Sequence, residues 1–324
     1  MVALNHLWNP LANLIGSHAL VTFYMISGYL ITLIVNKTYN GRHGFLYFIA
    51  NRALRIYPCY LLILLLTIIG LLTFPTAFNG AYTTIYLPEG AVEWSKNISL
   101  FLLHTADAIP VPPAWTLGIE LTFYILIALI GRYRSVVLLW FILSLSWHIL
   151  LVSYNAPFSD RYTPPTAASL FFSIGAMIYW YRDRMPLSLS ASPLIVLVFT
   201  FIFFPILVQA VGMDRTLYGY YVSGFLGAII LIMLLNPQQK RIWGTFQKDK
   251  LCGDLAYPVY LFHYFSGAIV NIATLFLFGK TAVGTTPYCL TSLTITFFLS
   301  CAYVYFIDRR LEYIRDKIRY RAQI

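Results

Sequence analysis

Residues 193–211 read PLIVLVFTFIFFPILVQAV, a stretch that contains no charged side chain. At about 1.5 Å per residue, a helix of this length crosses the roughly 30 Å hydrocarbon core of a bilayer. Eight further apolar stretches of comparable length lie on either side of it along the chain. The nine predicted spans are 19–35, 56–73, 115–131, 136–152, 166–181, 193–211, 217–235, 255–278 and 287–307. The sequence therefore predicts an all-α, polytopic bundle of transmembrane helices.

The composition leaves no room for a sizeable water-soluble domain between the spans. Of the 324 residues, 59% are hydrophobic and only 10% are charged. We therefore expect one transmembrane domain over residues 1–324, with no fused soluble domain. Residues 308–324 form a basic tail in which Leu311, Ile314 and Ile318 recur at helical spacing. This pattern is typical of a helix that lies on a membrane surface.

The basic residues are distributed unevenly between the loops. Eighteen of the 22 Lys and Arg residues lie in the segments 36–57, 132–134, 182–184, 236–254 and 308–324. By the positive-inside rule these segments, including the C-terminus, are predicted to be cytoplasmic. The net charge of +10 is then explained by topology and by contact with anionic membrane lipids, so no nucleic-acid partner is expected.

The first residues pose a problem of topology. Nine spans that end inside must begin outside, yet residues 1–8 (MVALNHLW) look like the last turns of a helix that arrives at the outer face. We expect a tenth, first span whose leading half is missing, through a mis-assigned start codon or a real truncation. The alternative is an ordinary short N-terminus on the outer side.

Ionisable groups inside predicted spans are candidate functional residues, because they are costly in hydrocarbon. Glu120 is the only carboxylate within a span, and it lies five residues after Trp115. A buried Glu can also simply tie helices together by hydrogen bonds. His6 lies in the short first segment, and His148 lies in an apolar run where a packing role is expected.

His263 lies near the middle of span 255–278. Tyr257, Tyr260 and Tyr264 share its helix and give this helix a polar, aromatic stripe. Such a stripe can line a pocket for substrate or can serve packing alone, and the sequence leaves both open.

Cysteine and metal-ligand patterns carry little information. Cys59, Cys252, Cys289 and Cys301 form no CxxC pair and have no His at ligand spacing. They are expected to act as small apolar residues, and no metal site is predicted.

Arg52 and Arg55 are three residues apart and would share one face of a helix just before span 56–73. Two guanidinium groups held together in this way are well suited to phosphate groups. Ordinary anchoring at the cytoplasmic boundary is the alternative for this pair.

Four motifs in chain order carry a family resemblance. They are FYMISGYLIT at 23–32 (pattern F-F-x-x-S-G-F-L-I-T), NRALRIYPCY at 51–60 (R-x-x-R-I-x-P-x-Y), WTLGIELTFY at 115–124 (W-S-L-x-x-E-x-x-F-Y) and GDLAYPVYLFH at 253–263 (G-x-x-S-Y-x-x-Y-L-x-H). Together they resemble acyltransferase family 3, the integral-membrane O-acyltransferases typified by bacterial O-antigen acetylases. Thr116 and Ala256 stand where the family usually has Ser. The resemblance runs from His6 to about Leu311.

The resemblance also implies roles for individual residues. His6 matches the family's candidate catalytic base, whereas the arginine that the family places about ten residues upstream would precede Met1. Glu120 would orient or charge-balance His6. The remaining roles are binding of acyl-CoA phosphates by Arg52 and Arg55, passage of the pantetheine arm past Ser27 and Gly28, and a substrate pocket formed by Trp115, Tyr257, Tyr260 and His263.

The function implied is transfer of an acyl group, usually acetyl, from cytoplasmic acyl-CoA to a hydroxyl of a cell-envelope polysaccharide or lipid-linked glycan. Acyl-CoA would be a co-substrate, and no permanently bound cofactor is expected. The protein would be a multi-pass protein of the bacterial inner membrane, in contact with membrane lipids. The alternative function is a transporter or flippase for a glycan or small molecule, although no internal repeat of the kind common in transporters is found.

Overall fold

The computed structural model describes residues 1–9, 15–82, 85–105, 107–184, 191–235 and 246–323. Within these ranges 82% of the structure is helical and no strand is present, which confirms the all-α prediction. The basic loop predicted at 236–254 lies outside the described residues as far as residue 245.

Each of the nine predicted spans coincides with a helix. These helices are α2 (Gly16–Lys37), α3 (Gly44–Thr73), α6 (Ala114–Ile130), α7 (Arg134–Ser153), α9 (Pro165–Tyr181), α10 (Ala191–Ala210), α11 (Tyr220–Leu234), α13 (Phe246–Phe278) and α14 (Thr286–Tyr303). Among the described residues, seven helical segments are long and apolar enough to cross a membrane. The count of about ten spans is therefore not confirmed, although α6 adds a shorter apolar helix.

Two helices begin well before the predicted spans. α3 begins at Gly44 instead of residue 56, and α13 begins at Phe246 instead of residue 255. The spans predicted from hydropathy leave out these first turns because the turns contain charged side chains. The helices themselves continue through them. Arg52 and Arg55 therefore lie inside α3, as their spacing requires for a shared face.

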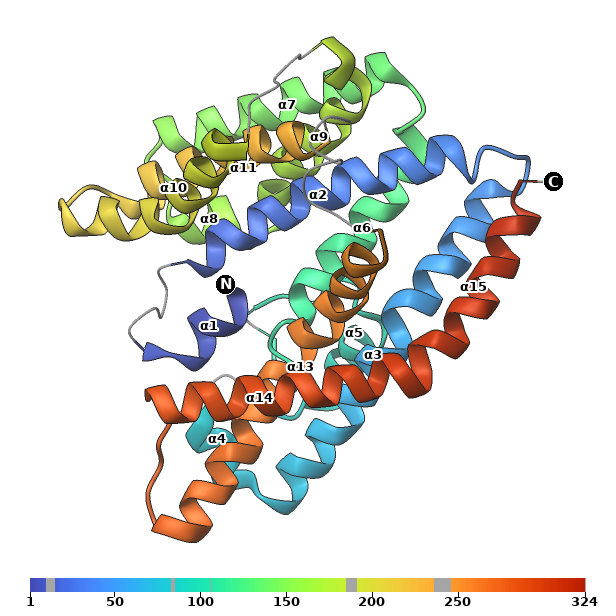
Figure 1. The fold of residues 1–324 in the computed structure, drawn as a ribbon. Helices are drawn as coiled ribbons and strands as arrows, with labels where there is room; N and C mark the ends of the chain where they lie inside the picture. The colour runs from blue at the N-terminus through green and yellow to red at the C-terminus, as the bar shows by residue number, and fades with distance from the viewer. Residues whose placement is uncertain (10–14, 83–84, 106, 185–190, 236–245, 324) are drawn as a thin grey trace. The chain divides into compact units, whose positions relative to one another are not determined.

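The chain forms two compact units, each assembled from separate parts of the sequence. The first unit contains residues 1–13, 46–121 and 250–324. Its main helices are α1 (Val2–Leu7), most of α3, α4 (Pro75–Ala81), α5 (Gly90–Ser99), the first turns of α6, α13, α14 and α15 (Arg309–Arg321). A π-helical segment, Val304–Asp308, joins α14 to α15, so the C-terminal part of this unit is one long helical rod (Figure 1).

The N-terminal helix α1 is held by apolar contacts in the first unit. Leu7 is completely buried in a cluster with Val270, Tyr288 and Cys289. Asn9 N–H also donates to the carbonyl of Gly284 at 3.0 Å. The helical turns predicted for residues 1–8 are thus present, and they fix the position of His6 within this unit.

The second unit contains residues 14–45 and 122–249 and is organised by the packing of α2 on α9. Gly28 of α2 faces the backbone of Phe172, and Gly175 of α9 faces the backbone of Met25. A side chain at either glycine would collide with the opposite main chain, so the two helices approach closely because both positions lack a Cβ. Phe172 also stacks on Tyr24, with ring centroids 5.0 Å apart.

Candidate active site

Two histidines that are far apart in the sequence meet in the first unit. His6 of α1 and His263 of α13 have their Nδ1 and Nε2 atoms 3.0 Å apart. The rings are stacked, with centroids 5.3 Å apart and an angle of 10° between the planes. His263 is completely buried, whereas His6 is half-buried. Both sequence interpretations for His263, pocket lining and packing, are compatible with this contact, and its place in a substrate pocket stays a prediction.

The hydrogen bonds of this pair determine which nitrogen atoms carry protons. His263 Nδ1 lies 2.7 Å from the carbonyl oxygen of Tyr260, which can only accept, so Nδ1 carries a proton. In a neutral imidazole the other nitrogen, Nε2, then has the lone pair and accepts from His6 Nδ1–H. In a neutral His6 the remaining nitrogen, Nε2, is therefore unprotonated. This is the state that a general base requires.

Aromatic rings extend from the histidine pair. The ring of Tyr264 lies 4.9 Å from that of His6 and 4.6 Å from that of Tyr82. The hydroxyl of Tyr82 is 2.9 Å from that of Tyr288. Tyr264 belongs to the aromatic stripe predicted from the sequence, whereas nothing in the local sequence of Tyr82 or Tyr288 indicates their contact.

The tyrosines predicted for the substrate pocket also form defined contacts. Thr116 donates its hydroxyl to the carbonyl of Pro113 at 2.8 Å, so it accepts the hydrogen bond from Tyr260, whose hydroxyl is also 2.8 Å away. Thr116 thus supplies the hydroxyl that Ser would have provided at this position. Tyr257 donates to the carbonyl of Ile56 at 2.8 Å and ties α13 to α3.

Glu120 is buried on α6, four residues after Thr116, and Trp115 is partly buried at the start of the same helix. The hydrogen bond described for His6 goes to His263. The proposed action of Glu120 on His6 therefore stays a prediction.

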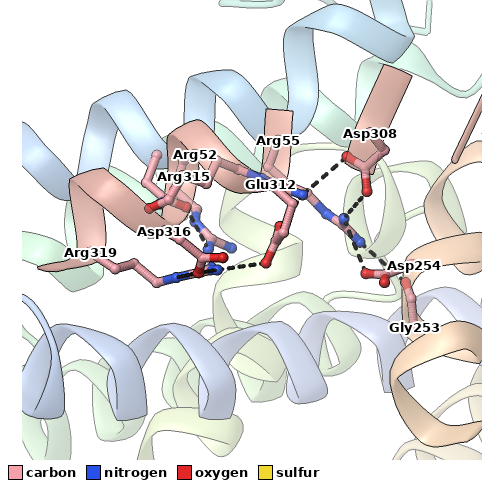
Figure 2. A network of polar contacts seen from close by, with 10 residues as sticks. Arg52, Arg55, Gly253, Asp254, Asp308, Glu312, Arg315, Asp316 and Arg319 are labelled. Atoms are coloured by element: carbon pink, nitrogen blue, oxygen red, sulfur yellow. Dashed lines mark hydrogen bonds and ion pairs between the residues drawn. The ribbon is translucent and has the colours of Figure 1, made fainter. Parts of the chain in front are cut away.

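Arg55 lies in a network of charged side chains (Figure 2). Its Nη1 is 3.1 Å from Asp308 and 3.5 Å from Asp254, and its Nη2 donates to the carbonyl of Gly253 at 3.2 Å. Arg52 lies with its guanidinium 5.8 Å from the ring centre of Phe48. The spacing of the two arginines predicted a phosphate site or a boundary anchor and gave no sign of these carboxylates, which come from distant parts of the sequence.

The residues predicted to pass the pantetheine arm belong to the second unit. Ser27 and Gly28 are both buried in α2, and the close approach of Phe172 accounts for the glycine. Their role toward acyl-CoA stays a prediction. His148 accepts or donates at both ring nitrogens, to Tyr221 and to the carbonyl of Ala167, each at 2.9 Å, as expected for a packing histidine.

A further buried histidine, His18, lies just before the predicted span 19–35. His18 is 1% exposed near the start of α2, and its Nδ1 lies 3.3 Å from the hydroxyl of Ser17. The predicted span began at residue 19, one position later, because hydropathy does not locate the first turn of a helix. No role for His18 follows from its contacts.

The first unit also contains a cavity of about 650 Å³ next to α4 and α5. Its lining includes Tyr86, Asn79 and three carboxylates, Glu89, Glu93 and Asp107. Burial alone would raise the pKa of Asp107, but hydrogen bonds from Lys96 at 2.8 Å and from the N–H of His104 at 2.7 Å lower it.

Comparison with known proteins gives one family. Searches of the curated proteins and of the solved structures returned no significant match. The family model of the acyltransferase domain of acyltransferase family 3 matches residues 2–305, which include every motif quoted from the sequence. The chain therefore belongs to acyltransferase family 3, a family of membrane acyltransferases.

Proposed function

We propose that this protein is a membrane-bound O-acyltransferase that moves an acetyl group from cytoplasmic acetyl-CoA to a hydroxyl of a cell-envelope polysaccharide or a lipid-linked glycan. The family match supports acyl transfer over the alternative of glycan transport. The observation that carries the proposal furthest is the hydrogen-bonded pair of His6 and His263, because it leaves His6 Nε2 able to accept a proton.

In the proposed reaction, His6 Nε2 takes the proton of the acceptor hydroxyl while its oxygen attacks the carbonyl carbon of the thioester. The new C–O bond forms, the C–S bond breaks, and the proton passes from His6 to the departing sulfur. The products are the O-acetyl ester and free CoA. His263 keeps Nδ1–H of His6 hydrogen-bonded throughout, as a carboxylate does for other catalytic imidazoles. Glu120 would stabilise the positive charge that His6 acquires.

The donor would bind along α13. Asp254, which contacts Arg55, and His263 lie nine residues apart on this helix, or about 14 Å along its axis. Phosphates bound at Arg52 and Arg55 would thus be separated from the histidine pair by a distance that the extended pantetheine arm is suited to bridge.

The acceptor would be recognised by aromatic and polar side chains of the first unit. Trp115, Tyr257 and Tyr260 would surround the reacting sugar. The cavity beside α4 and α5 offers carboxylates and an amide, which are acceptors and donors suited to sugar hydroxyls. The cavity residue Leu71 also belongs to the apolar cluster that Tyr264, the neighbour of His6, packs against.

The distribution of charge supports the proposed location, a bacterial inner membrane with the C-terminus in the cytoplasm. On this topology Arg52 and Arg55 lie at the cytoplasmic face, where acyl-CoA is made.

The proposal is tested by incubating membranes that contain the protein with [¹⁴C]acetyl-CoA and the envelope glycan fraction of the source cells. We expect alkali-labile ¹⁴C in the glycan and an equal amount of free CoA. Membranes with His6→Gln should give neither, because an amide cannot take up the proton at neutral pH. Glycan labelling by His6→Gln at the wild-type rate would refute the role of His6. Wild-type membranes that leave every glycan unlabelled would refute the acceptor class.

A further inference from the structure

The guanidinium of Arg55 is bound on one side by two carboxylates. Asp308 and Asp254 both contact its Nη1, at 3.1 and 3.5 Å, and the carbonyl of Gly253 contacts its Nη2 at 3.2 Å (Figure 2). These three contacts use three of the five N–H donors of a guanidinium. The side chain of Arg55 is 22% exposed, so a ligand can still reach it, but it would meet two negative charges beside the positive one.

The same carboxylates belong to a larger network that balances charge. Asp308 also accepts from Arg315 at 3.1 Å, and Glu312 pairs with both Arg315 and Arg319. Asp316 pairs with Arg319. Asn51, next to Arg52, donates to the backbone carbonyl of Arg315 at 3.0 Å, so α15 is fastened to the turn of α3 that carries the arginine pair.

Asp308 is the more buried of the two carboxylates that contact Arg55. It is 5% exposed, so its charge is shielded little by solvent. It also lies beyond residue 305, where the match to the family ends, together with the whole of α15. Three arginines (Arg55, Arg315 and Arg319) pair with four carboxylates (Asp254, Asp308, Glu312 and Asp316), and the charge of nearby Arg52 brings the net charge of the set to zero.

We propose that Asp254 and Asp308 limit the affinity of Arg55 for the phosphates of CoA, because they compete for the same N–H donors. The inference rests on the proposed function, in which Arg52 and Arg55 hold those phosphates. Acetyl-CoA and the product CoA carry identical phosphates, so contacts to them stabilise substrate and product equally. A partly neutralised Arg55 therefore allows CoA to leave after each transfer, and the two aspartates set the rate of product release.

The test compares three variants that each remove one negative charge: Asp254→Asn, Asp308→Asn and Asp316→Asn. Asp316→Asn is the matched control, because Asp316 pairs with Arg319, whereas Asp254 and Asp308 pair with Arg55. Binding of CoA and of adenosine 3′,5′-bisphosphate is measured by calorimetry on the full-length protein in detergent. We expect Asp254→Asn and Asp308→Asn to tighten binding of both ligands about three- to tenfold, and Asp316→Asn to leave it unchanged.

A kinetic measurement separates this effect from a structural one. In Asp254→Asn and Asp308→Asn, KM for acetyl-CoA and the inhibition constant of CoA should fall together. The value of kcat should also fall where release of CoA limits the rate. Asp254 is 27% exposed, so Asp254→Asn decides the question if the buried Asp308→Asn fails to fold.

Unchanged or weaker binding in Asp254→Asn would overturn the inference, as would equal tightening in Asp316→Asn. The proposed function fails separately. If the wild type binds neither ligand, or if Arg52→Ala binds both as tightly as the wild type, the phosphates do not sit at this arginine pair and both proposals fall. If Arg52→Ala weakens binding of both ligands but Asp254→Asn and Asp308→Asn do not tighten it, only the proposed competition is refuted.

Discussion

Replacing His263 tests whether the histidine pair acts as a unit. In His263→Phe a ring of similar size fills the buried position, but it offers no acceptor to His6 Nδ1–H. In His263→Gln the amide oxygen can reach roughly the position of Nε2 and accept that hydrogen bond. The two variants thus differ in the hydrogen bond to His6 while both remove the second imidazole.

The size of the effect follows from the lost hydrogen bond. A buried donor left without its acceptor costs about 1–3 kcal/mol. If this cost falls on the reactive orientation and tautomer of His6, the transfer rate falls roughly tenfold to a hundredfold in His263→Phe, at about 1.36 kcal/mol per factor of ten. His263→Gln should retain most of the rate, and His6→Gln should lose more than either, because it removes the proton acceptor itself.

The assay is acetyl transfer from [¹⁴C]acetyl-CoA to glycan as a function of pH, with CoA affinity measured in parallel. We expect the affinity for CoA to stay at the wild-type value in all three variants. Arg55 contacts α13 at Asp254, which lies nine residues from His263 along this helix. The acidic limb of the pH profile should move in His263→Phe, because the basicity of His6 depends on its partner. Wild-type kcat and pH profile in His263→Phe would refute the role of the pair.

Three further predictions address other parts of the molecule. Glu120→Gln should lower the transfer rate less than His6→Gln and leave CoA binding unchanged, as measured in the same assay; a loss equal to that of His6→Gln would mean that the charge itself is essential. Gly28→Ala should lower the free energy of unfolding by about 1–3 kcal/mol through overpacking at the α2–α9 contact, whereas Gly80→Ala, which has only an ordinary contact at 3.8 Å, should not; equal stability of both variants would contradict the packing. Asp107→Asn should lower the stability by about 1 kcal/mol at pH 7. Because the pKa of Asp107 is lowered in the folded state, this difference should disappear as the pH falls through that pKa, and a difference that persists in acid would contradict the assignment.

The positions of the helices could be predicted because each span is long and continuously apolar. Hydropathy reports the residues that suit hydrocarbon, and it loses the helix where charged residues begin, as it did at Arg52 and Arg55 in α3. Hydropathy also does not fix the length of a helix. Among the described residues seven helices are long and apolar enough to cross a membrane, whereas α6 is apolar but shorter.

The site was predictable only in part. Motifs placed His6 and His263 among the functional candidates, but their contact joins residues 257 positions apart and no local pattern encodes it. The carboxylates around Arg55 were missed for a similar reason: Asp254 and Asp308 come from α13 and from the segment after α14. Sequence spacing can show that two arginines share a face, but it cannot show which charges face them.

Mass spectrometry of the envelope glycan tests the central claim most directly. Cells that lack the gene are complemented with the wild type or with His6→Gln, and the glycan is compared before and after mild alkali. The wild type should add alkali-labile acetyl groups, each with a mass increase of about 42 Da expected from the chemistry of an O-acetyl ester. His6→Gln should add none while the protein is present at normal abundance. Acetylation at the wild-type level in the His6→Gln cells would contradict the claim that His6 is the base.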